Sequence, residues 1–146
     1  MYHYRECGLP YIYLANGYEL EEGPFGETVS IADVDNLHRT IARWVVENVP
    51  ALSGRELRFL RLEMGLTQGR LADLLGVTEQ TVSLAERNPE KALPSYTDRL
   101  LRIEAEAWLD ATQPVSDTLR RVHDAPRHAQ TAQQPFTHAG DEWAAA

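Results

Sequence analysis

Residues 65–86 read GLTQGRLADLLGVTEQTVSLAE, and this stretch decides the fold. Thr67 and Thr78 each stand directly before a segment with apolar residues at helical spacing, where N-cap residues are found. Gly65 and Gly76 follow apolar positions and suit the left-handed conformation that often ends a helix. Two short helices joined by a tight turn containing Gly form the helix-turn-helix unit. The stretch therefore predicts such a unit.

The residues before this stretch predict one more helix. Ser53 is placed to cap it, Leu57, Leu60 and Met64 lie on one face, and Gly65 ends it. We expect the core of the resulting helical domain to hold the apolar residues that share the inward faces and the turn, namely Leu57, Leu60, Leu71, Ala72, Leu75, Val77, Val82 and Ala85.

From about Leu57 to Arg102 the chain resembles the helix-turn-helix of the Cro/cI-type regulators, also called the xenobiotic-response-element (XRE) family. The matching positions fall in register, and they are Gly65-Leu66-Thr67-Gln68, Leu71-Ala72, Leu75-Gly76-Val77, Thr81-Val82-Ser83 and Glu86. The resemblance implies an all-α DNA-binding domain of four or five helices that works as a dimer on a two-fold symmetric operator. It also marks Arg61 and Glu86 as the family's buried ion pair.

The sequence departs from this family's pattern at three places. Ala85 stands where relatives often have a large apolar residue, so we expect looser packing of the third helix or a side chain supplied by another element. Asn88-Pro89 replaces the common Gly after that helix. Gly69 lies in the first turn of the second helix, where it costs roughly 0.5–1 kcal/mol relative to Ala.

The matching positions also imply a DNA-binding surface, since the first turn of the recognition helix points at base edges in the major groove. Gln68 is expected to bond a phosphate at the start of the preceding helix. Gln80 suits adenine, Glu79 suits cytosine, and Leu84 suits a thymine methyl group. The complete set of candidate DNA-binding residues is Gln68, Thr78, Glu79, Gln80, Ser83, Leu84, Arg87 and Lys91.

Some of these residues have a plainer interpretation. Taken alone, Gln80 and Ser83 would be ordinary solvated helix surface, and only their place in the motif points to DNA. Glu79 close to phosphates weakens binding unless it reads a cytosine, so a charge at a helix N-terminus is an equal alternative. Arg55 and Arg58 are expected to lie on a solvated face.

The first 52 residues predict a small β-hairpin region followed by a helix. Apolar runs at 11–14 and 18–20 flank Asn16-Gly17, the strongest short-range hairpin signal. Residues 28–31 predict a third strand. A helix is expected over 33–48, because apolar residues recur at helical spacing before Pro50. Ser30 and Asp33 have the spacing of a capping box.

The predicted segments are 1–52, 53–109 and 110–146, and charge divides the chain into three parts with nearly the same limits. Residues 1–52 hold 3 basic and 8 acidic residues, 53–102 hold 8 and 7, and 103–146 hold 3 and 7. The last segment is rich in Gln, Ala, Thr and His and has no sustained apolar period, which predicts a flexible, disordered or partly helical tail. The predicted fold is therefore mainly α, a Cro/cI-like helical domain preceded by a hairpin-plus-helix region.

Composition excludes several function classes. The length of 146 residues fits one domain or a small domain with an appendage. The single cysteine, Cys7, cannot form an internal disulfide, and with His3 it offers too few ligands for a zinc site. Motifs typical of hydrolases, metalloproteases and nucleotide-binding proteins are absent. We expect no enzyme activity, metal, cofactor or membrane segment, and a cytoplasmic location.

The sequence thus predicts a sequence-specific DNA-binding transcriptional regulator, a repressor that reads a palindromic operator as a homodimer. The alternative is an antitoxin, because a strand-rich unit leading through a helix into a helix-turn-helix resembles the layout of MqsA-type antitoxins, whose zinc-binding cysteine pairs are missing here. In that case residues 1–52, rich in tyrosine, bind a toxin. A third interpretation is a helix-turn-helix used only for protein contacts.

Overall fold

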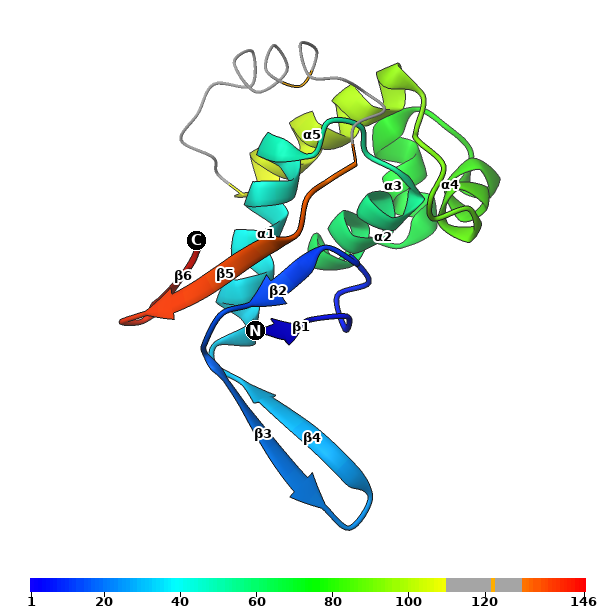
Figure 1. The fold of residues 1–146 in the computed structure, drawn as a ribbon. Helices are drawn as coiled ribbons and strands as arrows, with labels where there is room; N and C mark the ends of the chain where they lie inside the picture. Colours follow the sequence, from blue (N-terminus) through cyan, green and yellow to red (C-terminus); the bar gives the residue numbers. More distant parts are fainter. Residues whose placement is uncertain (110–121, 123–129) are drawn as a thin grey trace. The chain divides into compact units, whose positions relative to one another are not determined.

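The computed structural model describes residues 1–109, Val122 and residues 130–146, with the elements labelled as in Figure 1. The chain divides into two compact units, one made of residues 1–41 with 132–146 and the other of residues 42–131. The predicted boundary at residue 52 differs from this division, which falls inside the first long helix. Each unit is described separately below.

The first unit contains a four-stranded mixed sheet in the order β1-β2-β5-β6. The strands are β1 (Tyr2–His3), β2 (Ile12–Leu14), β5 (Gln134–Ala139) and β6 (Glu142–Ala145). β2 runs parallel to β5, whereas β1–β2 and β5–β6 are antiparallel pairs. One face of the sheet is buried, because Ile12, Leu14, Phe136 and Trp143 are all inaccessible or nearly so.

The strands β5 and β6 correct the prediction of a flexible tail. Residues 134–145 form a hairpin that completes the sheet, and Leu14 lies opposite Phe136 in its register. The Trp143 ring also donates from Nε1 to the carbonyl of Ala32 at 2.8 Å. The sequence does not predict these strands, because β5 pairs with the distant β2 and residues 134–145 contain only isolated apolar residues. Residues 110–121 and 123–129 of the predicted tail lie outside the described residues.

The first unit also has a hairpin, but not at Asn16-Gly17. β3 (Tyr18–Gly23) pairs with β4 (Gly26–Ile31) as a separate two-stranded sheet with its turn at Pro24 and Phe25. Residues 15–17 instead connect β2 to β3, which belong to different sheets. Gly17 has φ +75° and lies against the Trp143 ring, so the connection needs glycine for its conformation and for space. The predicted third strand at 28–31 is confirmed within β4.

The helix α1 (Val34–Asn48) matches the predicted helix over 33–48 and ends before Pro50. Its start differs from the expected capping box, because Ser30 lies in β4 opposite Glu19. Asp33 precedes the helix with φ +43°, and its carbonyl accepts a hydrogen bond from the amide of Leu37 at 3.0 Å. In the first unit, α1 contributes Leu37 and Ile41 to the core.

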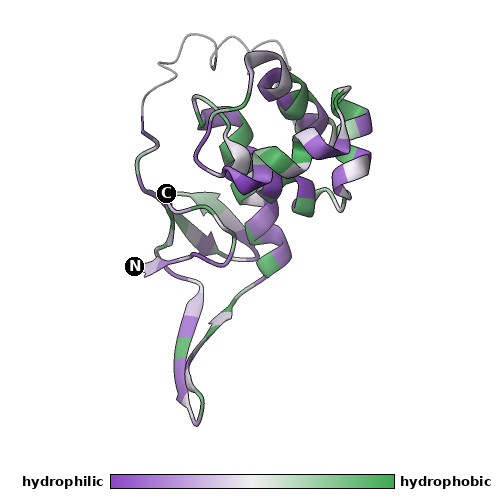
Figure 2. Cartoon of the chain, turned by 90° about the vertical axis from the view of Figure 1, so that its right-hand side faces the viewer, coloured by the Kyte–Doolittle hydropathy of each residue, from purple (hydrophilic) through white to green (hydrophobic). Residues whose placement is uncertain are grey.

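The second unit is helical and confirms the predicted fold class. After α1 come α2 (Gly54–Glu63), α3 (Gln68–Leu75), α4 (Glu79–Arg87) and α5 (Ser95–Leu109). Apolar residues of these helices alternate with polar ones, as the coloured cartoon shows (Figure 2). The predicted core residues that are buried are Leu57, Leu60, Leu71, Ala72, Leu75 and Val82, whereas Met64, Val77 and Ala85 are half-buried.

A buried polar cluster explains why residues 42–52 belong to the helical unit. Arg102 on α5 is fully buried and donates to the carbonyls of Val46 and Val49 at 2.7 Å each. Its Nε also donates to Asp98 at 2.6 Å, and Asp98 accepts the backbone N–H of Leu52 at 2.8 Å. These bonds satisfy carbonyls at the end of α1 that have no partner inside the helix. The end of α1 and the following connection are therefore fixed to α5.

Candidate nucleic-acid interface

The helices α3 and α4 begin where the sequence predicts them to begin. The hydroxyl of Thr67 accepts the backbone N–H of Arg70 at 3.1 Å, and that of Thr78 accepts the N–H of Thr81 at 3.2 Å. Gly76 ends α3 in the left-handed conformation with φ +69°. A side-chain cap satisfies one of the free N–H groups at each helix start, and a left-handed glycine allows the sharp turn. These contacts confirm the predicted N-caps at Thr67 and Thr78 and the predicted helix end at Gly76.

The predicted ion pair between Arg61 and Glu86 is formed. Arg61 donates from Nε and Nη2 to the two carboxylate oxygens of Glu86, at 2.7 and 2.8 Å, which makes a bidentate ion pair between α2 and α4. Arg61 also donates to the carbonyl of Leu66 at 3.0 Å. The hydrogen bond to Glu86 raises the pKa of Arg61. The pair fixes the recognition helix α4 and the start of the α2–α3 turn to α2.

The departures at Ala85 and Asn88-Pro89 coincide with a close approach between α2 and α4. A Cβ at Gly54 would overlap the carbonyl oxygen of Ala85 and lie 2.9 Å from that of Asn88. The backbone of α4 therefore touches the first turn of α2 directly, instead of packing loosely as expected from the small residue. The carbonyl of Pro89 accepts the N–H of Arg55 at 3.1 Å. The unusual turn thus satisfies a free donor at the start of α2.

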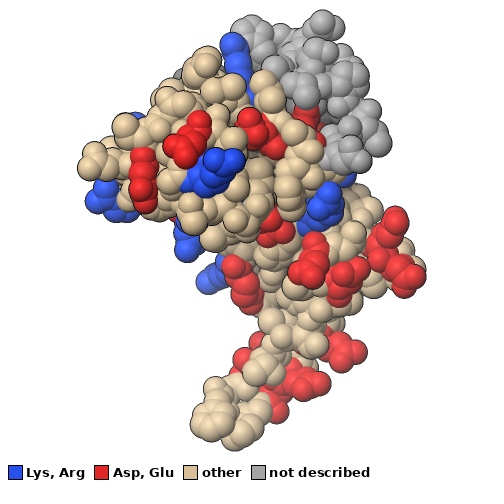
Figure 3. Space-filling model, turned by 180° about the vertical axis from the view of Figure 1, so that it is seen from behind, with Lys and Arg blue, Asp and Glu red and all other residues tan. Residues whose placement is uncertain are grey.

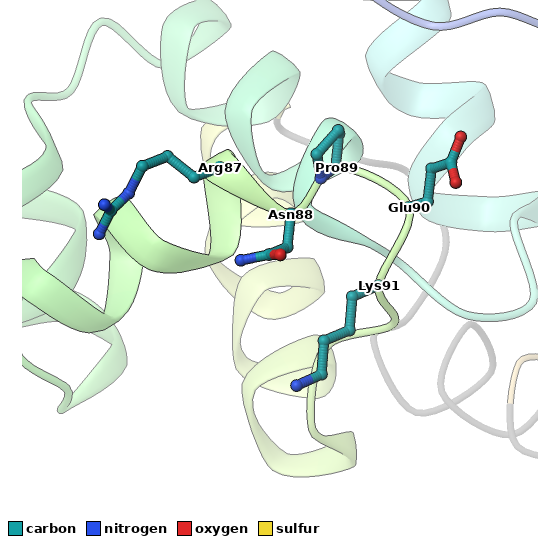
Figure 4. Close-up of a pocket in the computed structure, with 5 residues that line it drawn as sticks. All are labelled: Arg87, Asn88, Pro89, Glu90 and Lys91. Atoms are coloured by element: carbon teal, nitrogen blue, oxygen red, sulfur yellow. The ribbon is translucent and has the colours of Figure 1, made fainter.

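The same turn presents cations beside the end of α4. Residues 87–91 line an open recess, and the side chains of Arg87 and Lys91 point away from the turn in different directions (Figure 4). Both side chains are exposed. The position of Lys91 is fixed because its carbonyl accepts the N–H of Gly54 at 3.3 Å. Arg55, by contrast, donates to the carbonyl of Pro89 and pairs with Glu90, so its side chain is half-buried against this turn and does not lie on the expected solvated face.

The candidate DNA-binding residues all lie on α3 and α4, in the turn that joins them, and in the turn that follows α4. Gln68 is the first residue of α3 and is half-buried, Thr78 caps α4, and Ser83 is half-buried in the middle of α4. The remaining candidates are exposed, and they are Glu79, Gln80, Leu84, Arg87 and Lys91. Leu84 is 55% exposed, so its side chain is accessible for contact.

The position of Glu79 favours one of its two predicted interpretations. A Cβ at Gly69 would lie 3.4 Å from Oε2 of Glu79, so the carboxylate reaches back to the first turn of α3. Glu79 is also the first residue of α4. A negative charge is favourable at both helix starts because free N–H groups point there. The glycine at 69 leaves room for this side chain.

Other kinds of site find no support in the part of the chain that the structure describes. Residues 1–109, 122 and 130–146 contain no group of three His, Cys, Asp or Glu side chains able to hold a metal ion. No helix among them is long and apolar enough to cross a membrane. His3 stacks on Tyr13 with ring centroids 4.3 Å apart and its Nε2 lies 2.7 Å from the carbonyl of Pro10. It therefore has a structural place in the sheet.

Comparison with known proteins identifies the class of the helical domain. Residues 57–98 match the family model described as Helix-turn-helix, which covers 42 of the 146 residues. This segment is a helix-turn-helix of the XRE, or Cro/cI, type, a DNA-binding and regulatory class of domain. Searches of curated proteins and of solved structures found no match for the chain. The match ends within α5 and does not include the first unit.

Two features of this domain escaped prediction from sequence. Gly54 reads as an ordinary first residue of a helix, and its close contact with α4 depends on tertiary packing. The buried Asp98–Arg102 pair carried a visible signal, since opposite charges four residues apart lie on one helix face. That spacing usually indicates an exposed pair, and the buried carbonyls of Val46 and Val49 that require Arg102 are far away in the sequence.

Proposed function

We propose that this protein is a repressor that binds a palindromic operator as a homodimer and reads it with the N-terminal half of α4. The observation that carries the proposal is the exposed first turn of α4, which the Thr78 cap holds. The other end of α4 is tied to α2 by the Arg61–Glu86 pair and is followed by the exposed cations Arg87 and Lys91. A recognition helix of this kind enters the major groove with its first turns toward the bases. Two-fold symmetry puts the half-sites ~34 Å apart.

The exposed and half-buried polar residues of α3 and α4 then divide the work between backbone and bases. Gln68 and Thr78, at the two helix starts, contact phosphates together with Arg87 and Lys91. Gln80 makes paired hydrogen bonds with an adenine, Ser83 contacts a neighbouring base, and Leu84 packs against a thymine methyl group. Glu79 serves mainly as a negative charge at the starts of α3 and α4, where its carboxylate already lies.

Salt dependence of binding tests the phosphate contacts. The full-length chain is titrated onto a fluorescent duplex of random sequence at several salt concentrations. Arg87→Ala and Lys91→Ala are each expected to reduce the slope of log affinity against log salt by about 0.9, because each variant removes one phosphate contact. Arg5→Ala is the matched control, since it removes an exposed arginine of the first unit, outside the helix-turn-helix. Equal loss in the control, or binding without salt dependence, contradicts the proposal.

A second candidate function, an antitoxin, is supported by the separate compactness of the first unit. The helix-turn-helix lies wholly in residues 42–131, which leaves residues 1–41 and 132–146 available for a protein partner. In this case DNA binding controls the protein's own operon. The test is an adjacent short reading frame whose product is toxic alone and harmless when coexpressed with this chain. A harmless product, or toxicity that coexpression does not relieve, contradicts the antitoxin function.

A further inference from the structure

The hairpin β3–β4 has one apolar and one polar face. Directly opposite residues of an antiparallel pair point to the same side, and successive residues alternate. The register therefore puts Tyr18, Leu20, Val29 and Ile31 on one face, and Glu19, Glu21, Thr28 and Ser30 on the other. Both strands extend away from the four-stranded sheet of the first unit (Figure 1). The hairpin thus presents an amphipathic surface of its own.

The apolar face of this hairpin is accessible. Leu20 is 48% exposed, Val29 is half-buried, and Phe25 at the turn is fully exposed. A single two-stranded hairpin is marginally stable in water, so an exposed apolar face on one indicates a contact with another molecule. The root is fixed, because the amide of Ala32 donates to the carbonyl of Gly17 at 2.9 Å and the Tyr18 ring lies 5.3 Å from that of Tyr2.

The hairpin is also strongly acidic. Residues 18–31 contain four glutamates and no lysine or arginine. Glu22 and Glu27 face each other across the strands, next to Leu20 and Val29 on the apolar face. Like charges directly opposite each other destabilise a sheet, and a cation bound beside them offsets their repulsion. In the space-filling view the hairpin shows acidic side chains and no basic ones (Figure 3).

An open recess lies at the root of the hairpin, where residues of both faces meet. Residues 17–19 and 30–32 line it, and its volume is about 420 Å³. Tyr18 and Ile31 give it apolar walls, and Glu19 adds a carboxylate. This size suits a bulky side chain from a bound protein, with the carboxylate able to pair a neighbouring cation.

We propose that residues 18–31 form a docking arm for a protein partner whose surface combines exposed apolar side chains with arginine or lysine. The apolar face and Phe25 supply buried area, and Glu22 and Glu27 pair with the partner's cations. Charge complementarity selects this partner: DNA is a polyanion, and a second copy of the arm would bring two acidic hairpins together. The proposal is independent of the proposed DNA-binding function.

Selection from a library of displayed random peptides tests the docking arm. The full-length chain is immobilised, enriched peptides are synthesised, and their affinities are measured by fluorescence anisotropy. We expect the enriched sequences to join Leu, Phe or Trp to Arg or Lys. Glu22→Gln with Glu27→Gln, and separately Phe25→Ala, should weaken binding about tenfold. Glu21→Gln is the control, because Glu21 lies on the opposite face and outside the recess, and it should change affinity less than about twofold. Glu22→Gln alone removes the same single charge from the apolar face and should weaken binding more.

Four outcomes of the peptide and sedimentation experiments contradict the docking arm. It fails if no sequence is enriched, if enriched peptides lack cations, or if Glu21→Gln and Glu22→Gln have equal effects. It also fails if sedimentation shows self-association that Phe25→Ala abolishes, because the arm is then an interface between copies. Duplex binding is measured on the same variants and is expected to be unchanged. If the wild-type chain binds the peptides but not DNA, the docking arm stands and only the proposed DNA-binding function is contradicted.

Discussion

Gly54 begins α2 directly beneath the carbonyl group of Ala85 in α4, and no side chain fits between them. This backbone contact brings together the first helix of the DNA-binding domain and its recognition helix. The Arg61–Glu86 pair joins the same two helices about two turns further along α2. The orientation of α4, on which base reading depends, therefore rests on one close packing contact and one ion pair.

Gly54→Ala should destabilise the helical unit. The added Cβ overlaps backbone atoms of α4, which cannot move aside as a flexible side chain can, so we expect a loss of about 1–3 kcal/mol. Gly69→Ala is the control, because its Cβ meets Glu79 only at an ordinary contact distance of 3.4 Å and a better helix former replaces glycine. Denaturant unfolding measures both variants. Equal stability of Gly54→Ala and wild type contradicts the close contact.

Removing one partner of the Arg61–Glu86 pair should cost more than removing both. The side chains are only 12% and 6% exposed, so Arg61→Leu or Glu86→Leu leaves a nearly buried charge and should lose ~3–5 kcal/mol. The double variant should recover part of that loss, because no buried charge is left unpaired; Arg58, which also lies near Glu86, is exposed. A double-mutant cycle in denaturant gives the coupling free energy. Additive losses would show that the pair does not form in solution.

Tyr2 should titrate late. Its hydroxyl donates to the carboxylate of Glu6, and this hydrogen bond, with smaller effects of burial and of nearby carboxylates, raises the pKa of Tyr2 to about 12. A raised pKa means that the contribution to stability is complete below pH 10 and is lost as the pH rises toward 12. Tyrosinate absorbance should show a late component that disappears in Tyr2→Phe and in Glu6→Gln. A late component that persists in both variants assigns it to another tyrosine.

Deleting residues 132–146 should unfold the sheet of the first unit and spare the helix-turn-helix. The deletion removes β5, the neighbour of β2, and takes away the Trp143 ring that covers Gly17. Amide hydrogen exchange should then speed up at residues 12–14, whereas residues of α3 and α4 keep their protection. Unchanged protection at 12–14 would mean that β5 and β6 do not support this sheet in solution.

How far the sequence predicts the structure depends on how local the deciding contacts are. Thr67, Thr78 and Gly76 act within one helical turn, and their roles were predicted correctly. The candidate DNA-binding residues were placed by their register in that motif. The Asn16-Gly17 dipeptide was misleading because a local turn signal does not state which strands pair. Strand β5 lies more than a hundred residues from β2, so no local pattern could show that pairing.

The most direct test of the central claim is selection of bound sequences from a random duplex pool, with wild type and with Gln80→Ala, at two salt concentrations. We predict that wild type enriches an inverted repeat, and that binding falls as salt rises. Gln80→Ala should lose roughly 1–3 kcal/mol on the selected operator and become tolerant at one base pair of each half-site. No enrichment at either salt, or an unchanged preference in Gln80→Ala, would contradict base reading by the first turn of α4.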